Sequence, residues 1–254
     1  MSVSIKTARE IELMRHAGML LEKVHDELAN ALKPGMSTWE IDHLGEEIIR
    51  SFGCVPNFLH YNGYPASICV SVNDEVVHGI PNKRHILKEG DIVSLDAGLI
   101  YKGYHSDAAR THAVGEISKE AAQLIKVTRE SFFEGIKYAK AGNHLHQISA
   151  AIGNYAESFG YGVVRELVGH GIGTHLHEDP QIPNFACRGR GIRLQPGMTL
   201  AIEPMINIGR PEVAWLDDDW TVVTEDGTLS AHYENTVLTV SYTHLRAHET
   251  ELHL

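Results

Sequence analysis

The chain has 254 residues, of which 43% are hydrophobic and 22% are charged, and its formal net charge is −11. A chain of this length can bury a large core as one α/β domain, and the composition excludes disorder, collagen and a coiled coil. The acidic balance argues against a specific nucleic-acid surface, which needs clustered Lys and Arg, and no apolar run is long enough to cross a membrane.

The first third of the chain predicts two helices with clear boundaries. Residues 7–31 show apolar side chains at helical spacing, and Pro34 stops this helix. Ser37 and Glu40 have the spacing of a capping box, which begins a second helix that ends near Gly53. The elements expected after these are strands at 67–72, 91–96 and 99–114, helices at about 118–140 and 145–158, and strands at 198–203, 220–223 and 229–240.

An internal repeat relates the two halves of the chain. An offset of 107 residues aligns the ends of the expected helices, 33–35 on 140–142 and 51–53 on 158–160. Without a gap, the same offset places Asp96 on Glu203, each at the end of an apolar strand. The pattern indicates a pseudo-symmetric α/β domain with halves at about 7–110 and 115–240, and one site between them that receives ligands from both.

Two aspartates are brought together by the expected hairpin. We expect the chain to turn near 102–103, so that Asp107 lies opposite Gly98. Asp96 is two residues from Gly98, and strand side chains repeat every two residues, so both carboxylates share one face. A turn cap is the commoner role for a strand-end Asp by itself. Two adjacent anions on an apolar sheet repel each other, and a divalent cation offsets that repulsion.

The second half adds three more metal-binding side chains. His170 stands among the glycines of 169–173, where the backbone can approach a ligand closely. Glu203 ends an apolar strand, and Glu234 lies inside the strand expected at 229–240. Four carboxylates and one imidazole suit a pair of Mn²⁺, Fe²⁺, Co²⁺ or Zn²⁺ ions better than a structural thiolate zinc. Ions in such pairs lie about 3.5–4 Å apart and can share a bridging hydroxide as the nucleophile.

These residues, in this order, resemble the methionine aminopeptidases of the pita-bread fold. The matching stretches are VNDEVVHGIP at 72–81, DAG at 96–98, SDAART at 106–111, GHGIG at 169–173, LHEDP at 176–180, IEP at 202–204 and YENT at 233–236. The resemblance implies an α/β (α+β) fold in which a pseudo-two-fold pair of helix–helix–strand halves surrounds a curved antiparallel sheet. Residues 1–240 would form a single catalytic domain. Only 33 positions separate His170 from Glu203, which matches type I, the short bacterial type.

The resemblance also implies how the metal ligands divide between two divalent ions. Asp96 would hold one ion, His170 and Glu203 would hold the other, and Asp107 and Glu234 would bridge both. Glu203 would serve in addition as the general base toward the bridging water.

Two further histidines match positions that act on the substrate in the family. His78 would contact the scissile amide and assist proton transfer to the leaving amine. His177 would stabilise the tetrahedral oxyanion, a role that suits a neutral donor aimed at developing charge. For both residues, the alternative is a structural histidine whose hydrogen bonds are satisfied.

The methionine side chain would enter a small apolar cup. The residues at the family's positions for this cup are Tyr61, Tyr64, Cys69, Leu176 and Trp220, with Phe58 near its rim. An ordinary core role is the alternative for Cys69 and Tyr64. A small cup accepts unbranched Met and requires a small second residue beside the metals. The family also implies one Na⁺ or K⁺ ion held by backbone carbonyls near Asn73, Glu75 and Ser230.

The implied activity is removal of the N-terminal methionine from nascent proteins when the second residue is small, by attack of a metal-bridging hydroxide on the first peptide bond. The expected partners are nascent chains that begin with Met, with a transient ribosome contact, no membrane and no specific nucleic acid. We expect a monomer. We expect it in the cytoplasm, because the start of the chain lacks the layout of a signal peptide. The three well-separated cysteines suit reduced thiols.

Two other functions remain open at this stage. One is an aminopeptidase of the same fold that cleaves before proline, or a prolidase, although such enzymes usually have a large extra N-terminal domain. The other is a non-enzymatic pita-bread module that binds a partner or a nascent chain, although such relatives typically lose metal ligands. After Val240 the family continues through a turn into another strand. Residues 241–254 match neither, so we expect this tail to be foreign or read-through sequence.

Overall fold

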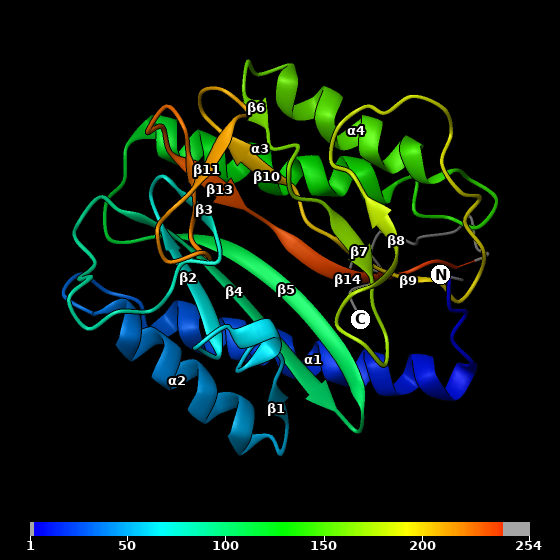
Figure 1. The fold of residues 1–254 in the computed structure, drawn as a ribbon, viewed down its shortest axis with the longest axis horizontal. Coiled ribbons are helices and arrows are strands. Elements are labelled where there is room, and N and C mark those ends of the chain that lie inside the picture. The colour runs from blue at the N-terminus through cyan, green and yellow to red at the C-terminus, as the bar shows by residue number, and fades with distance from the viewer. Residues whose placement is uncertain (1–2, 241–254) are drawn as a thin grey trace.

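A large antiparallel sheet organises the protein, as the computed structural model in Figure 1 shows. The structure describes residues 3–240, so the expectation for 241–254 lies outside the described residues. The strand order of the sheet is β1-β4-β5-β14-β9-β7-β8, and β2 pairs with β4. The bounds of its strands are Val55–Pro56 (β1), Ile68–Val72 (β2), Ile92–Tyr101 (β4), Tyr104–Ala113 (β5), Gly169–Gly171 (β7), Glu178–Ile182 (β8), Thr199–Ile202 (β9) and Glu234–Leu238 (β14).

Helices α1 (Ala8–Ala31) and α2 (Thr38–Ser51) form the first helix pair. Both start with a capping box in which a hydroxyl and a glutamate three residues later satisfy free backbone N–H groups, Thr7 with Glu10 and Ser37 with Glu40. The apolar stripe of α1 is fully buried and packs against β4 and β5. The two helices expected from the sequence are therefore confirmed.

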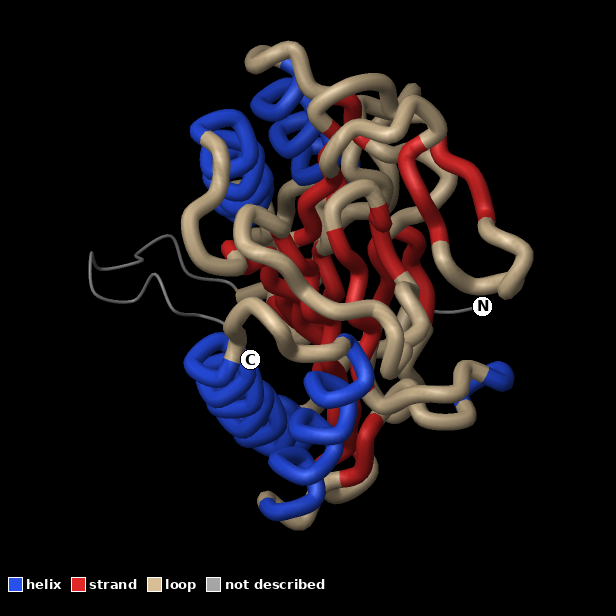
Figure 2. Tube along the Cα trace, turned by 90° about the vertical axis from the view of Figure 1, so that its left-hand side faces the viewer, coloured by secondary structure: helices blue, strands red, loops and turns tan. Residues whose placement is uncertain are grey.

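Helices α3 (Lys119–Ile136) and α4 (Leu145–Glu157) form the second pair, which packs closely together. Figure 2 shows both helix pairs on the same side of the strands, with loops on the other side. Two three-stranded sheets, β13-β10-β6 and β11-β12-β3, complete the fold. Their bounds are Glu75–Val77 (β3), Gly162–Val163 (β6), Met205–Asn207 (β10), Val213–Trp215 (β11), Val222–Thr224 (β12) and Ser230–His232 (β13), and a short 3₁₀ helix spans Tyr61–Gly63.

Three expected boundaries are wrong. The helix expected to reach residue 140 ends at Ile136, because the chain tightens into turns in which Tyr138 N donates to Gly135 O. The strand expected to end at residue 96 continues to Tyr101, since its last residues pair with β5 across the hairpin. The strand expected over 229–240 is divided at Tyr233, whose N–H donates to Pro204 O between β13 and β14.

The 107-residue offset reappears in the backbone geometry. Three pairs of glycines with this separation have matching positive φ angles, namely Gly35 and Gly142 (91° and 95°), Gly53 and Gly160 (72° and 81°), and Gly90 and Gly197 (92° and 87°). A positive φ favours glycine because a Cβ atom is strained there. Helices α2 and α4 also begin at residues with this separation, 38 and 145. On this basis we propose that the chain is one domain of two related halves. Across residues 3–240, no helix combines the length and apolar character needed to cross a membrane.

Candidate active site

The five candidate metal ligands come from five neighbouring strands of the large sheet. In the order of those strands, they are Asp96 on β4, Asp107 on β5, Glu234 at the start of β14, Glu203 directly after β9, and His170 on β7. Residues from both halves of the chain therefore meet in the middle of one sheet.

The strand register aims the carboxylates at one face. Asp107 pairs with Gly98, as the hairpin geometry predicted, and Asp96 pairs with Ala109. On the other side of β5, Glu234 pairs with the same Ala109. Residues that pair directly, or that lie two apart on one strand, point to the same side of a sheet. The carboxylates of Asp96, Asp107 and Glu234 therefore converge.

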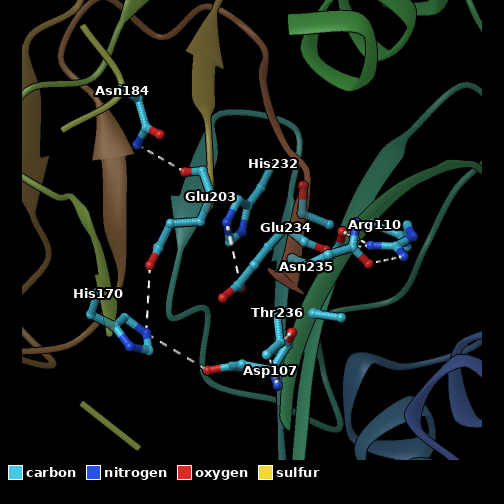
Figure 3. Close-up of polar contacts among 12 residues, drawn as sticks. Asp107, Arg110, His170, Asn184, Glu203, His232, Glu234, Asn235 and Thr236 are labelled. Carbon is cyan, nitrogen blue, oxygen red and sulfur yellow. Dashed lines mark hydrogen bonds and ion pairs between the residues drawn. The ribbon is translucent and has the colours of Figure 1, made fainter. Parts of the chain in front are cut away.

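His170 joins this cluster with a defined tautomer. Its Nδ1 lies 2.8 Å from the backbone oxygen of Gly171, and a carbonyl can only accept, so Nδ1 bears the proton. The Nε2 lone pair then faces the acidic groups, at 3.6 Å from Glu203 Oε1 and 4.0 Å from Asp107 Oδ2 (Figure 3). A histidine that donates one N–H to a carbonyl and presents the other nitrogen is the usual form of a metal ligand.

The charges of the cluster require compensation. Burial raises the pKa of Asp96 to about 7, and burial together with the neighbouring carboxylates raises the pKa values of Asp107, Glu203 and Glu234 well above their ordinary range. Burial lowers the pKa of His170 to about 3, so its imidazole is neutral. Oδ1 of Asp96, Oδ1 of Asp107 and Oε1 of Glu234 are buried and lack a hydrogen-bond partner among the described residues. Such oxygens fit divalent cations.

Two sets of three ligand atoms lie close enough to hold an ion. One set consists of Asp107, His170 and Glu234, and the other of Glu203, His232 and Glu234, with all atoms of a set within 4.8 Å of one another. Glu234 belongs to both sets. His232 was missed in the sequence, although it is two residues before Glu234 and adjacent to the matched stretch at 233–236.

A cavity of about 130 Å³ contains the cluster, and it unites most of the expected site residues. All five candidate ligands line it, together with His78, His177, Phe58, Tyr61, Tyr64, Cys69, Leu176 and Trp220. The expected apolar cup thus adjoins the acidic groups. Asn62 also lines the cavity and was not predicted.

Aromatic contacts arrange the histidines in this cavity. Tyr61 Oη lies 2.8 Å from His177 Nδ1, and the His177 ring stands edge-on to the His170 ring with 4.3 Å between centroids. His78 has a positive φ of 60° and faces the edge of Trp220. Burial lowers the pKa of His78 to about 4 and also lowers the pKa of His177. Both imidazoles are therefore neutral hydrogen-bonding groups.

A larger cavity, of about 630 Å³, lies between α1 and α3 on the helix-covered side of β5. It is lined by Arg110 and Arg129 but by none of the five candidate ligands, so the smaller cavity is the candidate active site.

The residues proposed for a monovalent cation lie outside the smaller cavity. Ser230 N donates to Asn73 O at 2.9 Å, and the Glu75 carboxylate accepts from Val72 N at 2.7 Å. The Na⁺ or K⁺ ion stays a prediction.

Comparisons with known proteins show the family to which the chain belongs. The sequence profile of metallopeptidase family M24 matches residues 12–241. A methionine aminopeptidase from Clostridium acetobutylicum is 55% identical over 235 residues, which are 92% of this chain and 94% of that protein. The crystal structure of a methionine aminopeptidase from Thermotoga maritima superimposes with a TM-score of 0.92 at 45% identity, covering 94% of this chain and 96% of that one.

A structural similarity to a more distant protein concerns the alternative function, an enzyme that cleaves next to proline. A Xaa-Pro dipeptidase from Bacillus anthracis is 26% identical with a TM-score of 0.74, and the match covers 93% of this chain but 59% of that one. The fold is thus shared, whereas sequence identity and mutual coverage are much higher with the first two proteins. The chain therefore belongs to metallopeptidase family M24 and, within it, to the methionine aminopeptidases of the bacterial type.

Proposed function

We propose that the protein is a metal-dependent aminopeptidase that removes the N-terminal methionine from new proteins whose second residue is small. The main supporting observation is one cavity in which a cluster of four carboxylates and a histidine adjoins an apolar cup. The names of the relatives agree with this activity. Nascent chains beginning with Met are the proposed substrates, and a transient ribosome contact, a monomeric state and a cytoplasmic location stay predictions.

The residues fit two divalent ions, drawn from Co²⁺, Mn²⁺, Fe²⁺ or Zn²⁺. In this proposal Asp96 would hold one ion, His170 and Glu203 would hold the other, and Asp107 and Glu234 would be shared between them. The strand register supports the bridging role of Glu234, because Glu234 and Asp96 both pair with Ala109, from opposite sides of β5. When bound, such a pair acts as a Lewis acid and makes a water-derived nucleophile available at neutral pH.

The chain's own residues then position the peptide and move protons. Glu203, which lines the cavity, would accept a proton from the attacking water. Tyr61 Oη lies 2.8 Å from Nδ1 of His177. In the proposed tautomer the hydroxyl is the donor, so that Nε2 of His177 carries its proton toward the developing oxyanion. His78 meets the first peptide bond as a neutral imidazole and assists proton transfer to the leaving amine.

The cup explains the choice of methionine. Tyr64 Oη donates to Gly79 O at 2.9 Å, and its ring meets the edge of Trp220 with 5.1 Å between centroids. These contacts hold two walls rigidly, while Leu176 and Cys69 are buried beside them. A long, unbranched side chain fits such a space. The second residue lies toward the carboxylates, so a small side chain is preferred there.

The deciding experiment compares two peptides. Purified protein with Mn²⁺, Fe²⁺ or Co²⁺ is incubated with Met-Ala-Ser or with a Xaa-Pro peptide, and free amino acids are measured. We expect methionine release that stops after treatment with a chelator and returns with added metal. Cleavage of the proline peptide alone would show a prolidase-like enzyme. Cleavage of neither would favour the binding module. Metal analysis of protein purified without added ions identifies the native metal.

A further inference from the structure

His232 is a buried imidazole without hydrogen-bond partners. Its side chain is 1% exposed, and neither ring nitrogen has a partner within residues 3–240. An imidazole always has at least one N–H group or lone pair to satisfy, and buried polar groups nearly always find a partner. The surroundings of His232 must therefore supply one in the working protein.

The nearest acceptor is a candidate metal ligand. His232 Nε2 lies 4.0 Å from Glu234 Oε2, and Glu203 belongs to the same group of atoms within 4.8 Å. Figure 3 shows the imidazole beside both glutamates. A small rotation of either side chain would bring Nε2 and Oε2 into hydrogen-bond distance.

The backbone of His232 is firmly placed, so only its side chain can adjust. His232 N donates to Thr111 Oγ1 at 2.8 Å, and Thr111 Oγ1 lies 2.9 Å from His232 O. His232 also lines the cavity between α1 and α3, but it does not line the smaller cavity of the five ligands. The imidazole therefore stands beside Glu234 and Glu203, close enough to His78 to interact with it electrostatically, although His232 is not part of the lining of the smaller cavity.

We propose that His232 is a positioning residue of the metal centre. Its Nε2–H donates to Glu234 Oε2 and orients that carboxylate so that the unpartnered Oε1 faces the cations. In this arrangement His232 is not itself a metal ligand. It sets the geometry of Glu234, the carboxylate that both ligand sets share. The inference rests on the proposed function, because it assumes that the cluster binds metal.

Metal affinity in two variants tests this role. His232→Gln keeps a neutral N–H donor, whereas His232→Leu keeps the bulk but removes the donor. Loss of a hydrogen-bond partner of a metal ligand typically weakens metal binding about 10–100-fold. We therefore expect His232→Leu to weaken Mn²⁺ binding to this extent in calorimetric titrations of the chelator-treated protein, and His232→Gln to stay within a few-fold of the wild type.

A matched control is His112→Leu. His112 on β5 also has a buried, unpartnered Nε2, but it belongs to neither ligand set. We expect this variant to bind Mn²⁺ like the wild type. Thermal melting of the metal-free proteins shows whether either leucine variant unfolds. If His232→Leu does not fold, the comparison of His232→Gln with His232→Ala decides the question.

Pulsed EPR of the Mn²⁺-loaded protein with ¹⁵N-labelled histidine counts the bound imidazoles. We expect one, from His170, in the wild type and in His232→Leu. A second coupled nitrogen that disappears in His232→Leu would make His232 a ligand and overturn the positioning role. Wild-type affinity in His232→Leu would also overturn it. A wild-type protein that binds no divalent ion would instead refute the proposed function.

Discussion

Replacement of Asp107 by Asn tests the metal centre with the least disturbance of the fold. The side chain keeps its shape and loses its charge. The backbone stays anchored because Asp107 N donates to Thr236 Oγ1 at 3.0 Å and Thr236 Oγ1 donates to Asp107 O at 3.1 Å. In the metal-free protein, the change removes one of four crowded carboxyl groups, and the charge of Asp107 contributes to the raised pKa of Glu234. We therefore expect a metal-free melting temperature equal to or above that of the wild type.

The metal-loaded protein should respond in the opposite direction. Asp107 belongs to a ligand set, so its loss should exceed the 10–100-fold effect of losing a ligand's hydrogen-bond partner. A weakening of about 100-fold equals about 2.7 kcal/mol. With Mn²⁺ in large excess, the free energy by which bound metal stabilises the folded protein falls by about the same 2.7 kcal/mol. For a protein of this size, it lowers the metal-induced rise in melting temperature by about 5–10 °C.

The assay is scanning calorimetry with and without Mn²⁺, together with methionine release from Met-Ala-Ser. We expect Asp107→Asn to lose at least about 100-fold in turnover. The control is Asp26→Asn, which makes the same change of charge on an exposed position of α1. A variant that keeps the full metal-induced shift and the wild-type turnover would refute the bridging role. A variant that melts early without metal would show that Asp107 is structural.

Burial raises the pKa of Asp96 to about 7 from an ordinary 3.8, so the metal-free protein should lose stability as the pH rises from about 4 to about 7. Metal binding needs the ionised carboxylate. Bound metal should therefore raise the melting temperature more at pH 8 than at pH 6. Calorimetry at the two pH values checks this, and an equal shift at both would contradict it. Tyr61→Phe removes the hydrogen bond to His177, which contributes about 0.5–1.5 kcal/mol. We therefore expect kcat to fall about 3–10-fold with little change in KM. An unchanged kcat would reject the proposed tautomer of His177. Gly135→Ala would place a Cβ atom 2.5 Å from Ile152 Cγ1, between α3 and α4. This variant should be less stable by about 1–3 kcal/mol in urea unfolding, with an unchanged kcat. An unchanged unfolding midpoint would mean that the two helices separate easily.

Local chemistry was sufficient to predict the elements with strong signals. The capping box of Ser37 and Glu40 placed the start of α2, because the two side chains satisfy N–H groups of their own helix. The pairing of Asp107 with Gly98 followed from a tight turn and the two-residue period of strands. The alignment of Asp96 with Glu203 followed from the repeat. Each of these inferences depends on contacts that are near in sequence or duplicated within it.

The division of the strand at Tyr233 could not be predicted in this way. Residues 229–240 have a continuous strand-like pattern, but the strand's two parts pair with different partners. β13 pairs with β10, whereas β14 enters between β5 and β9. The break exists because two sheets compete for one segment, and that competition depends on packing between distant parts of the chain.

The sequence by itself predicted five candidate metal ligands, determined the register of the hairpin that joins Asp96 to Asp107, and indicated membership of a known family. Only the tertiary structure decided that Glu234 on β14 pairs with Ala109 on β5 and so lies among ligands from both halves of the chain. Only it placed the His232 imidazole beside Glu234, with no hydrogen-bond partner for either ring nitrogen among the described residues. The physical reason is that strand order within a sheet arises from long-range packing of both helix pairs, which a local pattern of residues does not contain.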